Sequence, residues 1–188
     1  MALKLITAAI TYPVTLAEAK LHCRIDSIDD DALVTALITA ATDMAEQKIG
    51  RAIMQQTWEL TLDDFPDAFE LTRTPVQSIA SIKYYDINGV QQTLGNTLYM
   101  FDGADDFGFA YVVPVYNGTW PNTRSQINAV AVRYVAGYAS AAVVPQSIKQ
   151  WVLLMIGAMY ESREMEGAQQ THSLGFADRL LDRYGVIG

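Results

Sequence analysis

The chain is poor in the side chains that most often build metal centres and nucleophile–base pairs. It has one cysteine and two histidines in 188 residues. A single cysteine excludes an internal disulfide, and we expect the protein to fold in a reducing cytoplasm. The apolar run at residues 151–160, WVLLMIGAMY, covers about half of a bilayer span, and the first residues lack a convincing secretory signal.

Charge is also scarce, and it is unbalanced. Charged residues make up 18% of the chain, with 21 acidic and 13 basic residues, for a net charge of −8. An acidic protein does not wrap nucleic acid through phosphate contacts, so we expect no sequence-specific binding of DNA or RNA. Hydrophobic residues reach 51%, which is enough for a folded globular core.

Patterns that mark common enzymes are missing as well. There is no G-x-S-x-G, H-E-x-x-H, Walker or G-x-G-x-x-G sequence. Asp106-Phe107-Gly108 matches a kinase tripeptide, but no phosphate loop or catalytic loop accompanies it, which favours an acidic turn. We therefore expect no catalysis, cofactor or metal.

The stretch LHCRIDSIDDDAL, residues 21–33, places the cysteine beside a histidine and just before four aspartates. Neighbouring residues on a helix point about 100° apart, so His22 and Cys23 are badly placed to share an ion. The aspartates lack the spacing and glycine of a calcium loop. The stretch instead predicts a helix end, a loop and a new helix, with Cys23 as a small buried hydrophobe.

Helical periodicity dominates the first part of the chain. Thr15 and Glu18 form a capping box at the start of one predicted helix. Asp29 is the predicted N-cap of a second helix that ends at Gly50. We expect that helix to bury one broad apolar face made of Leu33, Leu37, Ala40, Ala41, Met44 and Ala45, and Val34, Ile38 and Ile49 widen it.

Alternation with period two replaces the helical pattern between residues 54 and 142. QTWELTLDDF reads as a strand, and Asn88-Gly89 predicts a type I′ hairpin turn. Further candidate strands follow, so we expect an antiparallel module of five or six strands.

The last part returns to helix. A long helix after Pro145 carries a core stripe of Ile148, Trp151, Val152, Met155, Ile156 and Met159, and it is expected to end near Gly167. The prediction is an α+β fold. Residues 1–53 and 143–188 form a helical core of two N-terminal helices and the long one, and residues 54–142 form an inserted antiparallel β module.

A short amphipathic helix is predicted at the C-terminus, after a polar linker. Such a tail can dock onto another protein, or it can fold back onto its own core, and both interpretations stay open. Its candidate partner-binding residues are Phe176, Arg179, Leu180, Arg183 and Tyr184.

The ordered set of motifs resembles the head–tail connector, or adaptor, proteins of tailed bacteriophages, prophages and gene transfer agents. The segments are PVTLAEAKLHCRID, DDDALVTALITAATDMAEQKIGRA, QQTWELTLDDFP, PVQSIASIKYYDINGVQQTL, VRYVAGY and VPQSIKQWVLLMIGAMYESRE. The similarity runs from Pro13 to about Glu164. Within the family, the chain looks like the longer branch that carries a β insertion.

The resemblance implies structural work in the virion neck, after assembly in the host bacterial cytoplasm. Such proteins form a homo-oligomeric ring of about twelve copies, with head-to-tail contacts, beneath the portal protein. A stopper or tail-side neck protein binds the other face, and DNA passes through the channel. Acids that could line the channel or face a neighbouring subunit are Asp29, Asp30, Asp31, Asp43 and Glu46, although a plain solvated helix face explains them too.

Two alternatives from other classes remain. A β module that binds a ligand such as a carbohydrate would use Trp120 and the tyrosines Tyr84, Tyr85, Tyr99 and Tyr111. A hydrolase would use His22 or His172 with Cys23.

Overall fold

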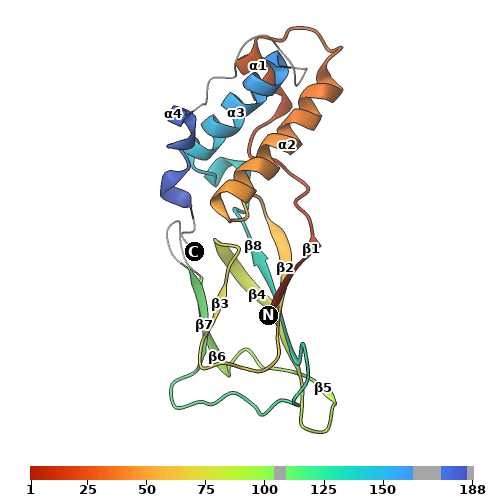
Figure 1. Ribbon diagram of the computed structural model, residues 1–188, viewed down its shortest axis with the longest axis vertical. Helices are drawn as coiled ribbons and strands as arrows, with labels where there is room; N and C mark the ends of the chain where they lie inside the picture. Colours follow the sequence, from red (N-terminus) through yellow and green to blue (C-terminus); the bar gives the residue numbers. More distant parts are fainter. Residues whose placement is uncertain (104–108, 163–174, 186–188) are drawn as a thin grey trace. The chain divides into compact units, whose positions relative to one another are not determined.

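The computed structural model describes residues 1–103, 109–162 and 175–185 (Figure 1). The chain divides into two compact units. One holds residues 1–9 and 55–138 and is built of strands, and the other holds residues 10–54 and 139–188 and is built of helices. The α+β class with an antiparallel β module is confirmed. The first nine residues, however, belong to the strand unit and not to the helical part.

The helical unit packs α1 (Leu16–Cys23), α2 (Asp31–Ile49) and α3 (Gln146–Glu161) against one another. The capping box is present as predicted: Glu18 N–H donates to Thr15 Oγ1 at 3.2 Å, and Thr15 N–H donates to Glu18 Oε2 at 2.6 Å. Arg24 ends α1 in the left-handed conformation. The described part of α3 stops at Glu161, and the predicted end near Gly167 lies outside the described residues.

The start of α2 differs from the sequence prediction, and its buried face agrees with the prediction only in part. The N-cap is Asp30, one residue later than expected, and Asp29 instead accepts a hydrogen bond from the Ser27 hydroxyl at 2.5 Å. The buried positions are Val34, Ile38, Ala41, Thr42, Ala45 and Ile49. Leu33 and Met44, predicted to be core, are 37% and 42% exposed. Both sides of this helix are apolar, so periodicity alone could not select the side that packs.

The larger sheet of the strand unit has five antiparallel strands in the order β1-β2-β8-β4-β5. Its strands are β1 (Ala2–Thr7), β2 (Gln56–Leu62), β8 (Val130–Ala136), β4 (Val76–Tyr85) and β5 (Gln91–Thr93). Leu60, Val132, Tyr134 and Ile82 are buried on its inner face. Strand β1 was not predicted, because its own sequence shows no alternation that would separate it from the following residues.

A second sheet has the order β3-β7-β6, from β3 (Phe69–Leu71), β7 (Ala110–Pro114) and β6 (Tyr99–Asp102). The described residues thus form eight strands in two sheets, more than the five or six expected. The β4–β5 hairpin is confirmed, but its turn is not type I′. Only Gly89 has a positive φ, of 78°, and Asp86 Oδ1 holds the loop by accepting from the backbone of Asn88 and Val90.

Two short helical turns close the described chain, α4 (Gly175–Asp178) and the 3-10 turn η2 (Asp182–Tyr184), where one continuous helix was expected. Ala177, Leu181 and Tyr184 are buried. The Trp151 indole N–H donates to Asp178 at 3.4 Å, and Lys48 pairs with the same carboxylate at 3.2 Å. The described tail therefore folds back onto its own helical unit.

Candidate partner-binding surfaces

The cysteine and histidine of the opening stretch lie beside each other at the end of α1. His22 and Cys23 line a small pocket of about 230 Å³ between the end of α1 and α3, together with Arg24, Gly157, Tyr160 and Glu161. Burial, with the nearby Glu161 carboxylate, raises the pKa of the Cys23 thiol above its ordinary value. A thiol held protonated is a poor nucleophile. His172, the other candidate base, lies outside the described residues.

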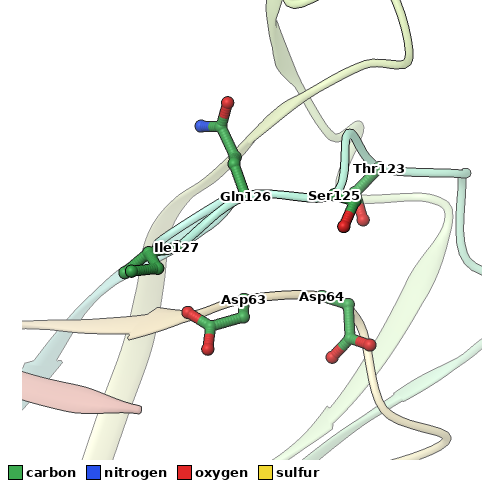
Figure 2. Close-up of a pocket in the computed structure, with 6 residues that line it drawn as sticks. All are labelled: Asp63, Asp64, Thr123, Ser125, Gln126 and Ile127. Atoms are coloured by element: carbon green, nitrogen blue, oxygen red, sulfur yellow. The ribbon is translucent and has the colours of Figure 1, made fainter.

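A more open depression of about 500 Å³ lies in the strand unit, where the chain leaves β2 (Figure 2). Asp63 and Asp64 form one side, and Thr123, Ser125, Gln126 and Ile127 form the other. Figure 2 shows the Gln126 side chain pointing away from both carboxylates. Asp63 accepts from the Asn128 backbone N–H at 2.9 Å, so it holds the loop. Within the described ranges no group of three or more His, Cys, Asp or Glu side chains could hold a metal ion.

Two of the five aromatic candidates of the carbohydrate alternative, Trp120 and Tyr84, pack against other aromatic rings. Trp120 stacks on Phe65 with ring centroids 4.8 Å apart and planes 10° apart, and Phe69 lies 5.7 Å away. Phe65 also meets Tyr84 edge to face. Stacking on Phe65 occupies one face of the indole that a sugar ring would need.

Of the five acids proposed for a channel or a subunit contact, three make contacts within the helical unit. Asp30 accepts from the Tyr160 hydroxyl, and Asp31 pairs with Lys20. Glu46 accepts from the Ile53 backbone N–H at 2.7 Å, which fixes the chain after α2. Asp29 and Asp43 are exposed. Three of the five carboxylates therefore serve contacts within the helical unit.

The tail candidates divide in the same way. Tyr184 is buried, and its hydroxyl accepts from Ser147 at 3.3 Å. Leu180 is half-buried, whereas Arg179 and Arg183 are exposed. Phe176 belongs to α4. The surface that this tail offers to a partner is mainly the arginine side.

Part of the apolar face that sequence reasoning assigned to the core is an exposed stripe on α2. Leu33, Leu37, Ala40 and Met44 recur at helical spacing and form what we call the α2 stripe. Ala40 is exposed and Leu37 half-buried. Other large apolar side chains of the helical unit are exposed too, namely Ile10, Leu21 and Ile28 at 92%, 82% and 78%. Exposed apolar surface of this extent is typical of proteins that work in assemblies.

Comparison with known proteins defines the class. The model of the phage gp6-like head-tail connector proteins matches residues 13–108, just over half of the chain, and the chain belongs to this family. No curated protein gives a significant sequence match.

Solved structures of gene transfer agent (GTA) particles share the fold. A chain of the "Neck of empty GTA particle computed with C6 symmetry" superposes with a TM-score of 0.81 at 21% identity. A chain of the "Virion of native gene transfer agent (GTA) particle" gives 0.79 at 21%, and one of the "Neck of native GTA particle computed with C12 symmetry" gives 0.75 at 19%. Each match covers 100% of this chain and 97% of the other.

In the described ranges, no helix combines the length and apolarity needed to cross a membrane.

Proposed function

We propose that this protein is a non-catalytic adaptor subunit of a virion neck, which forms a ring between the portal and the tail-side neck proteins. Membership of the connector family supports the class of function, and the fold shared with chains of virion and neck particles supports the place. DNA passes through the ring without being gripped, because the acidic chain and the phosphates repel each other.

The observation that carries the proposal is the α2 stripe. An exposed apolar helix face is costly for an isolated subunit, and burying it against a neighbour removes that cost. Ala36 and Ala40 are both exposed, and their short side chains allow a second element to approach closely. A closed ring requires this head-to-tail kind of contact, in which the stripe meets a different surface of the next copy.

The double substitution Leu33→Lys and Met44→Lys tests this assignment. Both side chains are partly exposed, so the free energy of unfolding should change by less than about 1 kcal/mol. Assembly with the portal, measured by mass photometry, should fall at least about tenfold, because two charges would be buried at the contact. Rings that assemble as the wild type does would contradict the assignment.

Two controls separate assembly from folding. Thr35→Lys adds a charge on another exposed side of α2, and it should leave assembly unchanged. Ile38→Ala removes a side chain that is 2% exposed, and it should lower the free energy of unfolding by about 2–4 kcal/mol.

A further inference from the structure

Strand β1 forms one free edge of the five-stranded sheet. It pairs with β2 on one side, and within the described residues no strand pairs with its other side. The edge carries little of the protection that natural edge strands have, since it has no proline and one charged residue, Lys4. Leu5 and Ile6 are 41% and 36% exposed, so apolar side chains accompany the open backbone.

The hydrogen-bond pattern shows which residues of β1 point outward. Tyr85 N–H donates to Ala129 C=O at 2.9 Å, which fixes the bonded pairs between β4 and β8. In an antiparallel sheet, successive residues of a strand bond alternately to the strand on one side and to the strand on the other. Following this alternation from β8 through β2 shows which residues of β1 bond to β2. Lys4 then bonds to β2, and Leu3 and Leu5 direct their N–H and C=O groups away from the sheet.

The opposite edge of the sheet is β5, and among the described residues no strand pairs with its outer side either. Leu94 N–H donates to Ile82 C=O at 2.8 Å, so Gln92 bonds to β4 and its two neighbours do not. Gln91 and Thr93 are exposed and point their N–H and C=O groups outward. Each edge therefore offers two residues, spaced two apart, with unpaired backbone donors and acceptors.

We propose that β1 of one copy pairs with β5 of the next copy, so that the sheets join edge to edge around the ring. The inference rests on the proposed ring. Open backbone groups on an edge are satisfied by another strand, which makes an extended segment the fitting partner. A second copy is favoured because a head-to-tail ring needs two different complementary surfaces, and the two ends of this sheet supply them with equal number and spacing.

Hydrogen exchange tests the pairing directly. In rings assembled on the portal, peptides covering residues 2–7 and 90–94 should each gain about two slowly exchanging amides relative to the free monomer, because two outward N–H groups on each edge become bonded. Unchanged exchange in both peptides, together with protection of the α2 stripe, would overturn the edge pairing and leave the ring intact. Protection of one edge only would indicate a different strand as partner and would also overturn it.

Proline substitutions give a second test that does not depend on exchange. Leu3→Pro and Thr93→Pro each remove one outward N–H and no bond within the sheet, so the melting temperature should change little. Each should weaken assembly about tenfold, and Leu3→Val, which keeps the N–H, should not. Both substitutions act on the same interface and each removes a different hydrogen bond, so the double variant should lose more affinity than either single one. A loss in only one of the two single variants would show that the two edges do not pair with each other, and no loss in either would show that neither edge is used.

The same experiments separate the inference from the function on which it rests. A wild-type chain that stays monomeric both alone and with the portal contradicts the proposed ring. Rings that form equally well from the wild type and from the double proline variant contradict only the edge pairing.

Discussion

Thr15 and Glu18 show how far a single local interaction can be derived from the chain. The cap side chain and the third helical residue satisfy two backbone donors that α1 would otherwise leave open. Both partners lie within three residues, so tertiary packing has little influence on the motif. This explains why the sequence was sufficient to predict it.

Replacing Thr15 by alanine should lower the free energy of unfolding by about 1 kcal/mol, as measured by urea denaturation. The hydrogen bonds from Thr15 lower the pKa of Glu18 below its ordinary value of 4.5. The contribution of the ionised Glu18 to folding stability is therefore complete above pH 4.5. It is lost as the pH falls through the lower pKa that Glu18 has in the folded state. Glu18→Gln preserves a capping partner and is the control. A Thr15→Ala variant as stable as the wild type at pH 7 would show that the cap contributes nothing.

Any enzymatic interpretation of this chain depends on the thiol group of Cys23. Burial and Glu161 raise its pKa above the ordinary value of 9.0. Alkylation by iodoacetamide in the folded protein should therefore be slower at pH 7.5 than that of a free thiol, with a midpoint above pH 9. The urea-unfolded chain is the internal control. A midpoint well below pH 8 would indicate an activated cysteine and would favour the hydrolase alternative.

At the scale of elements, the tail combines an inward and an outward side. Leu181 and Tyr184 pack into the helical unit, while Arg179 and Arg183 are exposed. Truncating the tail would therefore expose core residues as well as remove a contact. Charge reversal of the arginines is a sharper test of portal docking, because it leaves the buried side unchanged.

Arg179→Glu with Arg183→Glu should reduce affinity for the portal about tenfold, with the melting temperature nearly unchanged. The effect should shrink at high salt, since exposed charges are screened. Lys83→Glu, an equally exposed charge on the outer strand surface, should have no effect. Surface plasmon resonance at two salt concentrations measures the affinity of the wild type, the arginine variant and the Lys83→Glu control for the portal. Unaltered binding by the arginine variant would refute tail docking.

Some elements could be predicted from sequence and others could not, for physical reasons. In α3 the predicted stripe and the buried positions coincide at Ile148, Trp151, Val152 and Ile156. α2 is apolar on two sides, and an isolated sequence cannot distinguish the side that faces α3 from the side that we propose faces a neighbour. Strand β1 depends on pairing with β2, about fifty residues away, which no local pattern reports.

The candidate site residues could likewise be predicted where the signal is local, but not where it depends on packing between elements. Asp29, Asp30 and Asp31 were recognised as a helix start, but the pairing of Asp31 with Lys20 and of Asp30 with Tyr160 depends on how α1 and α3 pack beside α2. Trp120, named as a carbohydrate candidate, stacks on Phe65, a contact between residues 55 positions apart that no local pattern reports. Burial was predicted wrongly for residues whose exposure depends on which face of their helix is covered by other elements.

At the scale of the whole molecule, two features have one explanation in a ring. The exposed α2 stripe and the open β1 and β5 edges are both unfavourable or unused in an isolated subunit. Head-to-tail assembly beneath a portal would cover both. The family to which the chain belongs is a connector family, which agrees with this explanation.

Electron microscopy of the protein mixed with its portal is the most direct test of this central claim. We predict closed rings of this chain, stacked coaxially on the portal, with the α2 stripe at the contact between neighbouring copies. A portal that remains bare at saturating protein, or one that binds isolated monomers without contacts between them, would contradict it.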